Sequence, residues 1–181
     1  MNPVSYHARR AINGRPEWMW FLLLLTGVLV SASCHYSFTG SSVPSHLKTV
    51  AIPLFDDQSA FGEPGLREKL TNKLIERFVR DNSLQVADKT RADSIVEGVI
   101  VGVRDEPTVV EKGESVTKRR ITMTVQATFQ DMKLKKRVWE KQLSDWGDYE
   151  IGGGPAQRQV GIDAAIEKLS EDILLETVSG W

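Results

Sequence analysis

The sequence predicts an α+β fold, a two-layer sandwich in which two helices pack on one face of a mostly antiparallel sheet of four to five strands. Two observations support this prediction. Apolar residues recur every three to four positions near residues 64–82 and 160–178, which is typical of amphipathic helices. Between these segments, residues 121–130 alternate strictly between apolar and polar side chains, as in a strand with one buried face.

The expected elements follow the order β-α-β-β-β-β-α. The first strand is predicted at residues 47–54, where Pro53 indicates the strand end or an edge position. A polar loop at 55–65 precedes the first helix, and Pro64 suits a helix start. The apolar face of this helix is formed by Leu66, Leu70, Leu74 and Phe78, and the helix is expected to end near Asp81 and Asn82.

A short strand at 84–86 and a longer one at 94–103 come next. The longer strand is apolar on both faces, which indicates a position well inside the sheet. Gly98 and Gly102 lie within it and indicate either close packing or a bulge. Residues 105–116 contain proline and glycine and are predicted to form a turn region.

The strand at 121–130 should present five side chains to the core: Ile121, Met123, Val125, Ala127 and Phe129. A turn at 131–136 leads to a returning strand at 137–146. A glycine-rich loop at 148–155 then connects to the last helix, at 160–178. The triple glycine in this loop lacks the lysine and hydroxyl of a phosphate-binding loop, so we interpret it as a linker.

Composition and charge exclude several classes of function. The net charge is −1 and becomes about −3 without residues 1–33, so bulk electrostatics give no support for nucleic-acid binding. A single cysteine excludes an internal disulfide and a cysteine-rich zinc site. The only histidines, His7, His35 and His46, precede the body of the domain, and no nucleophile–base pair is visible. We therefore predict no enzyme, no metal site and no cofactor.

The N-terminal residues resemble a secretory leader. Residues 1–17 are polar with a basic bias, and residues 18–30 form an apolar run of 13 residues. This run is short for a membrane-spanning helix, which needs roughly 20 residues, and it fits the apolar region of a signal peptide. Small residues at 31–33 precede Cys34. We predict a lipoprotein signal peptide at 1–33, lipid attachment at Cys34, a tether at 34–46 and an α+β domain at 47–181.

The cleavage motif is an imperfect match to a bacterial lipobox. The usual leucine three residues before the cysteine is replaced by Ser31, with Val30 one position earlier. An ordinary secretory signal or an uncleaved anchor are the alternatives. The three acyl chains of a bacterial lipoprotein would anchor the domain stably. By resemblance to enterobacterial sorting, His35 in place of aspartate favours the outer membrane.

The residues from Cys34 to Gly40 resemble the Cys-Gly-Tyr-x-Phe-x-Gly start of LptE, a family of lipopolysaccharide-assembly lipoproteins. Residues 47–55, 92–98 and 138–139 also resemble this family. The resemblance implies a non-enzymatic plug and assembly partner in the lumen of the outer-membrane β-barrel LptD, in contact with lipopolysaccharide. It also implies a lipid-anchored position at the periplasmic face of the outer membrane.

An alternative resemblance is to curli-secretion-type or TolB-amino-terminal-type domains. The strand at 50–55, with the loop and helix that follow, is similar to the opening of these modules. They would make the protein an oligomeric or scaffold component of the periplasm. The motif at residues 36–40 favours LptE instead.

Two basic clusters are candidates for binding anions. One lies at 118–120, and the other contains Lys133, Lys135, Lys136 and Arg137. If residues 121–146 form a hairpin, these clusters lie at opposite ends of it and form no continuous patch. We predict the second cluster as a possible lipopolysaccharide-binding site, because cations at a turn can bind phosphates. The alternative is that these charges protect strand ends and edges from unwanted pairing.

Overall fold

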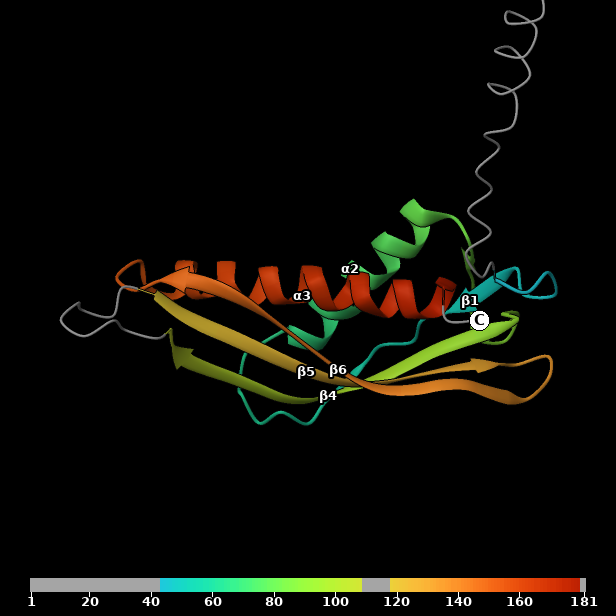
Figure 1. The fold of residues 1–181 in the computed structure, drawn as a ribbon, viewed down its shortest axis with the longest axis horizontal. Helices are drawn as coiled ribbons and strands as arrows, with labels where there is room; N and C mark the ends of the chain where they lie inside the picture. Colours follow the sequence, from blue (N-terminus) through green and yellow to red (C-terminus); the bar gives the residue numbers. More distant parts are fainter. Residues whose placement is uncertain (1–42, 109–117, 180–181) are drawn as a thin grey trace, which may run out of the picture. The chain divides into compact units, whose positions relative to one another are not determined.

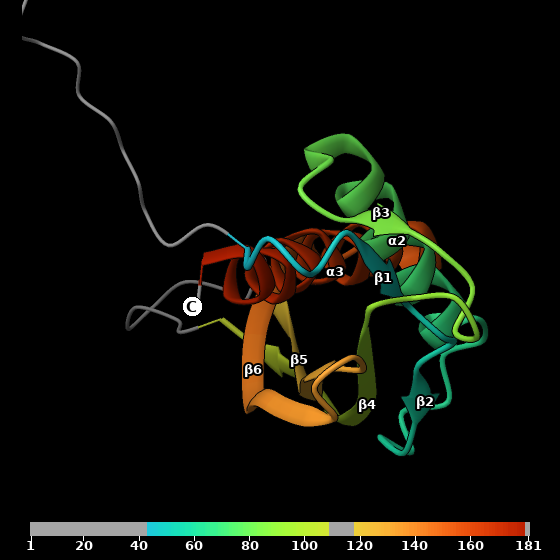
Figure 2. The same ribbon diagram turned by 90° about the vertical axis from the view of Figure 1, so that its right-hand side faces the viewer.

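The computed structural model describes residues 43–108 and 118–179, and these form a two-layer α+β sandwich. Helices α2 and α3 cover the same face of a curved sheet (Figures 1 and 2). The predicted fold class is therefore confirmed. The elements in chain order are β1 (Thr49–Ala51), β2 (Asp56–Asp57), α2 (Leu66–Asp81), β3 (Gln85–Val86), β4 (Ser94–Pro107), β5 (Lys118–Asp131), β6 (Lys136–Glu150) and α3 (Gly154–Ser179).

The sheet is mixed, whereas the sequence predicted mostly antiparallel pairing and four to five strands. Six strands take part, in the order β3-β1-β4-β5-β6 with β2 beside β4. Strand β1 is parallel to both β3 and β4, and β2 is parallel to β4, while β4, β5 and β6 form an antiparallel meander. The parallel part arises because α2 connects β1 to β3 as a crossover, which returns the chain in the same direction.

Helix α2 begins and ends where the sequence predicted. Its four expected core residues, Leu66 to Phe78 at intervals of four, are all buried. The helix ends at Asp81, and the capping residue Asn82 adopts a left-handed conformation (φ 60°) and donates its backbone N–H to Phe78 O at 3.0 Å. This is a common way to satisfy a last carbonyl of a helix.

Strand β5 confirms the prediction from alternation. All five apolar residues from Ile121 to Phe129 are fully buried, and the threonines and glutamines between them face away from the helices. The apolar stripe of α3 meets this face with six buried residues: Ile162, Ala165, Ile166, Leu169, Ile173 and Leu174. The core therefore lies between β4–β6 and the two helices.

Gly98 and Gly102 of β4 have different roles: one allows close packing, and the other lies at a bulge. A side chain at Gly98 would place its Cβ 2.4 Å from the ring of Phe55, so glycine allows the ring to lie against the strand. Gly102 follows a register shift between β4 and β5, which identifies a bulge there. The bulge changes which residues of β4 face the core, so that Val103 packs on it after Ile100.

Several element boundaries differ from the prediction. Strand β1 has three residues instead of the eight at 47–54, and β2 lies in the expected polar loop. Strands β4 and β6 continue to Pro107 and Glu150, because their pairing with β5 extends to both ends of that strand. Helix α3 begins at Gly154 instead of residue 160, since Pro155 is well suited to a first helical turn.

The predicted leader, residues 1–33, and Cys34 lie outside the described residues. Residues 109–116 of the expected turn region lie outside them too. Within the described part of the chain, no helix has the length and apolar character that crossing a bilayer requires.

Candidate functional site

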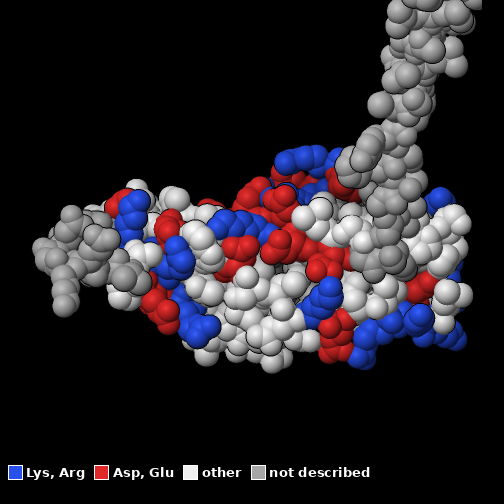
Figure 3. All heavy atoms as spheres, viewed as in Figure 1, with Lys and Arg blue, Asp and Glu red and all other residues white. Residues whose placement is uncertain are grey.

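The turn between β5 and β6 presents basic and apolar side chains together. We call residues 132–137 the β5–β6 tip. Leu134 is 66% exposed and Met132 is 40% exposed, and Lys135 adopts a left-handed conformation (φ 52°). The tip lies at one end of the sheet, where basic side chains gather on the surface (Figures 1 and 3).

The four predicted lipopolysaccharide-binding residues lie together on this tip, but they are not equally available. The Nζ atom of Lys133 lies 2.9 Å from Asp93 Oδ1 and donates to the backbone oxygen of His46 at 2.6 Å. Arg137 pairs with Glu140. Among the described residues, Lys135 and Lys136 make no ion pair. An external anion would therefore meet these two lysines first.

The buried carboxylate of Asp131 stabilises the conformation of the tip. Its carboxylate is only 3% exposed, lies 2.6 Å from His46 Nε2, and accepts the backbone N–H of Leu134 at 2.8 Å. Burial alone would raise the pKa of this carboxyl. The hydrogen bonds with His46 and Leu134 outweigh burial and hold the pKa below its usual range. Asp131 is thus charged in the folded protein and stabilises the turn.

Asp93 connects the tip to the first strand. Its Oδ2 atom accepts the backbone N–H groups of Lys48 at 2.8 Å and Thr49 at 3.2 Å, and its backbone oxygen accepts Met132 N–H at 2.8 Å. The contact with Lys133, followed by these backbone hydrogen bonds, lowers the pKa of Asp93 against the effect of burial. The start of β1, the start of β4 and the tip therefore form one hydrogen-bonded unit.

This unit contains residues that the sequence reasoning missed. The sequence places His46 in the tether, outside the domain, but its imidazole is hydrogen-bonded to Asp131, 85 positions later in the chain. The sequence places Asp131 in the turn at 131–136. A signal for its role exists, because it occupies the next core-facing position after Phe129 in the alternation of β5. A carboxylate at a core-facing position requires a partner.

The other basic cluster, at 118–120, lies at the opposite end of the hairpin, as predicted. Lys118 pairs in register with Glu150, whereas Asp131 pairs with Lys136. Each of its cations has a carboxylate partner within the fold: Lys118 with Glu150 at 3.3 Å, Arg119 with Asp105 at 2.8 Å, and Arg120 with Asp148 at 2.7 Å. We assign this cluster to stabilising the end of the sheet.

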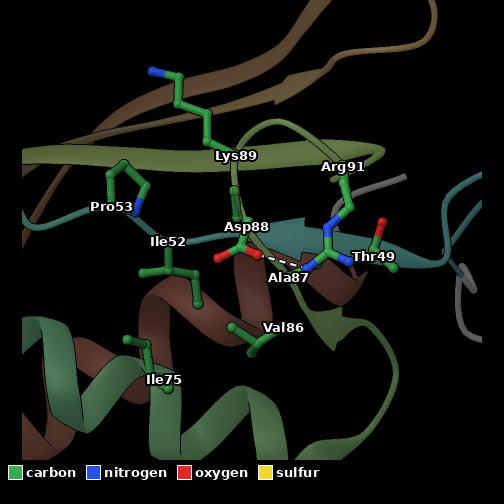
Figure 4. Close-up of a pocket in the computed structure, with 10 residues that line it drawn as sticks. Thr49, Ile52, Pro53, Ile75, Val86, Ala87, Asp88, Lys89 and Arg91 are labelled. Atoms are coloured by element: carbon green, nitrogen blue, oxygen red, sulfur yellow. Dashed lines mark hydrogen bonds and ion pairs between the residues drawn. The ribbon is translucent and has the colours of Figure 1, made fainter.

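An open groove of about 690 Å³ lies between α2 and the β1–β3 edge of the sheet (Figure 4). Its lining is mixed, with Ile52 and Val86 facing Ile75 of α2 on the apolar side. The rim carries Asp88 and Arg91, which pair with each other at 2.6 Å. Lys89 also lines the groove and pairs with Glu97 of β4 at 2.8 Å, so each of these rim charges has a partner within the domain.

Within the described ranges, no three His, Cys, Asp or Glu side chains come together as a metal site would need. The ion pairs of the domain join its own elements, such as Arg77 of α2 with Glu167 of α3 at 2.7 Å. Arg77 also donates to Ser170 Oγ at 2.7 Å. These groups connect the two helices.

Comparison with protein families identifies the domain. A model of LptE, described as lipopolysaccharide-assembly, matches residues 47–177. The chain belongs to the LptE family. This match favours LptE over the curli-secretion-type and TolB-amino-terminal-type modules. LptE is a family of non-enzymatic lipoproteins.

Solved structures share the LptE fold at low sequence identity. Protein CT253 from Chlamydia trachomatis has a TM-score of 0.54 and 11% identity, over 72% of this chain and 95% of that chain. Protein XCC0632 from Xanthomonas campestris has a TM-score of 0.52 and 12% identity, over 77% of this chain and 91% of that chain. Comparison with curated protein sequences gives no match.

Proposed function

We propose that this LptE-family protein is a plug and assembly partner of the outer-membrane β-barrel LptD in lipopolysaccharide transport to the cell surface. In this proposal, residues 1–33 are removed as a signal peptide and Cys34 carries the lipid. Residues 34–46 connect the lipid to the domain on the periplasmic face of the outer membrane. The observation that carries the proposal is the family match across residues 47–177.

The surface of the domain suits a water-filled lumen. The outer face of β5 carries five uncharged polar residues, Thr122, Thr124, Gln126, Thr128 and Gln130. No helix covers this side of the sheet, because α2 and α3 both lie on the other side (Figure 2). The interior of a large outer-membrane barrel is polar and filled with water, which suits this face, where the charged residues Glu97 and Glu140 flank Thr128 in register.

Lipid on Cys34 would add to this partnership by restricting the domain to one membrane surface. Tethering converts the encounter with a barrel in the same membrane into one at high effective concentration. The described end of the tether, residues 43–46, lies on the domain itself, through His46 and through Val43, which packs on the core. In this proposal, the connection from the lipid to the domain runs through the residues that precede Val43.

Co-purification from outer-membrane extract tests the partnership. We expect the tagged protein to recover one large β-barrel in equal amount, resistant to washing with high salt. Recovery of a ring composed only of this chain, or of the chain alone, would contradict the proposal. A barrel is identified by its heat-modifiable migration and by mass spectrometry.

We further propose that the β5–β6 tip binds lipopolysaccharide phosphates through Lys135 and Lys136. Replacing both residues by glutamate should weaken binding of purified lipopolysaccharide by roughly tenfold for each lost contact, since a hydrogen bond to a charged group contributes about 1.5–3 kcal/mol. Binding is measured by the fluorescence anisotropy of labelled lipopolysaccharide.

The matched control is the double replacement Arg67→Glu with Lys69→Glu. It changes the net charge equally, on the first turn of α2, where acidic residues are tolerated by the helix dipole. The control should bind like the wild type. If the tip variant binds lipopolysaccharide as the wild type does, Lys135 and Lys136 protect strand ends and edges instead. Strand β6 needs such protection because it is the last strand of the sheet.

A further inference from the structure

Strand β6 is the last strand of the sheet, so one of its edges has no neighbouring strand among the described residues. The strand is 15 residues long, and it pairs with β5 without a register shift from Trp139 to Glu150. In Figure 2 it forms the left border of the sheet. A long edge strand presents a row of backbone N–H and C=O groups that can pair with another chain.

Side chains of the domain itself close part of this edge. The backbone oxygen of Trp146 accepts a hydrogen bond from Lys168 Nζ of α3 at 2.8 Å, and the backbone N–H of Trp146 donates to Asp145 Oδ1 at 2.7 Å. The charged groups of Arg120 and Lys168 also lie over the Trp146 ring, 3.5 and 3.6 Å from its centre. Both backbone groups of Trp146 therefore point away from β5, and α3 covers the edge at this position.

The next three outward positions toward the β5–β6 tip have no such cover. Residues whose backbone groups point to the same edge alternate along an antiparallel strand, so Ser144, Gln142 and Glu140 point outward as Trp146 does. Within the described part of the chain, no hydrogen bond reaches the outward N–H and C=O groups of these three residues. The open stretch is about 14 Å long at the usual rise of a strand, which is enough for a segment of about five residues.

A carboxylate without a cation lies beside the open stretch. Asp172 of α3 is half-buried and hydrogen-bonded to Asp145, the residue that follows Ser144 in β6. Lys168 pairs with Asp145 at 3.5 Å, whereas no described lysine or arginine forms an ion pair with Asp172. Burial, and then the charge of Asp145, raise the pKa of Asp172 above its usual range. Figure 3 shows acidic side chains gathered along α3 on this side of the molecule, so a cation brought to this edge would meet complementary charge.

We propose that an extended segment of the barrel partner adds to the open edge of β6 at residues 140–144 as a further strand. The backbone of this segment pairs with the outward groups of β6. A basic side chain of the segment faces α3 and pairs with Asp172. This inference deepens the proposed LptD partnership and rests on it. Main-chain pairing supplies the affinity and the side-chain contact supplies the register, as in other complexes in which a peptide extends a sheet.

The chemistry of the edge favours a loop of the barrel over two other occupants. Strands in the wall of a closed barrel are paired on both sides, so the added segment must come from a loop that enters the lumen. A second copy of this chain, paired through its own β6, would bring two acidic α3 surfaces side by side. Like charges across an interface disfavour such a pair. A basic segment avoids this repulsion.

Hydrogen exchange of single backbone amides, in the free protein and in the complex purified with the barrel, tests the strand addition. The amides of Glu140, Gln142 and Ser144 should exchange fast in the free protein, because they have no acceptor, and roughly tenfold or more slowly in the complex. The amides of Lys141 and Leu143 are already paired with β5 and should be protected in both. A contact through side chains would not select every second amide.

The substitution Asp172→Lys tests the charge of the segment. Its matched control is Asp163→Lys, at an exposed position of the same helix. Asp172→Lys should lower the protection of the three amides in the complex by roughly fivefold, the upper effect of a partly exposed ion pair, and Asp163→Lys should leave it unchanged. Equal protection in the two variants would overturn the basic character of the segment.

Recovery of the barrel and protection of the amides are separate measurements. If the barrel co-purifies but the three amides exchange as fast as in the free protein, the strand addition is wrong and the LptD partnership stands. If no barrel co-purifies, the proposed function is contradicted and this inference with it. Protection that appears in the free protein at high concentration, together with a doubled mass in light scattering, would assign the edge to a second copy of this chain instead.

Discussion

Replacing Gly147 with alanine should destabilise the domain by about 3 kcal/mol, at the upper end of the usual cost of an overpacked contact. The added Cβ would lie 2.1 Å from the backbone oxygen of Gly161 and 2.7 Å from the Cβ of Ala164. These atoms belong to α3, so the helix would have to move away from β6. The free energy of unfolding is measured by urea denaturation followed by tryptophan fluorescence.

Gly102→Ala is the matched control, because Gly102 also lies in a long strand of the sheet. No heavy atom lies within 4 Å of the position that its Cβ would take, and its backbone is not left-handed. We expect a change within about 0.5 kcal/mol. Equal stability of the two variants would show that α3 does not pack on β6 as closely as described.

Replacing Cys34 with alanine should abolish lipid attachment and remove from the outer membrane the protein that is not bound to the barrel. Three acyl chains would anchor the protein stably, whereas none of the described helices is long and apolar enough to span a membrane. The wild type should incorporate radiolabelled palmitate and migrate at the size expected without residues 1–33. The variant should incorporate none, and any of it that is not bound to the barrel should be missing from the outer-membrane fraction.

The substitution Ser31→Leu should have the opposite effect and improve processing of the precursor. It restores the leucine that a lipobox usually has three residues before the cysteine, so the precursor should be processed faster in a pulse-chase experiment. A wild-type protein that keeps its full length and takes up no palmitate would replace the lipoprotein hypothesis with an uncleaved anchor. Palmitate uptake by both Cys34→Ala and the wild type would place the lipid elsewhere.

The sequence determined those features that depend on the period of side chains along one element. The alternation of residues 121–130 predicted β5 and its core face, and the spacing of four residues predicted α2 to within two residues at each end. These periods are local, since they follow from the geometry of a strand or a helix. The sequence also predicted that the two basic clusters lie at opposite ends of the hairpin. In an antiparallel hairpin, residues at the turn are far from residues at the open end.

The tertiary structure alone decided how strands pair and which charges remain free. Nothing within β1 specifies its parallel neighbours β3 and β4, because a strand's own sequence does not encode its partner. Likewise, Lys133 and Lys135 are equivalent in sequence, yet only Lys133 meets Asp93, forty positions earlier in the chain. The availability of a cation depends on such distant contacts, and these form only when the chain is folded.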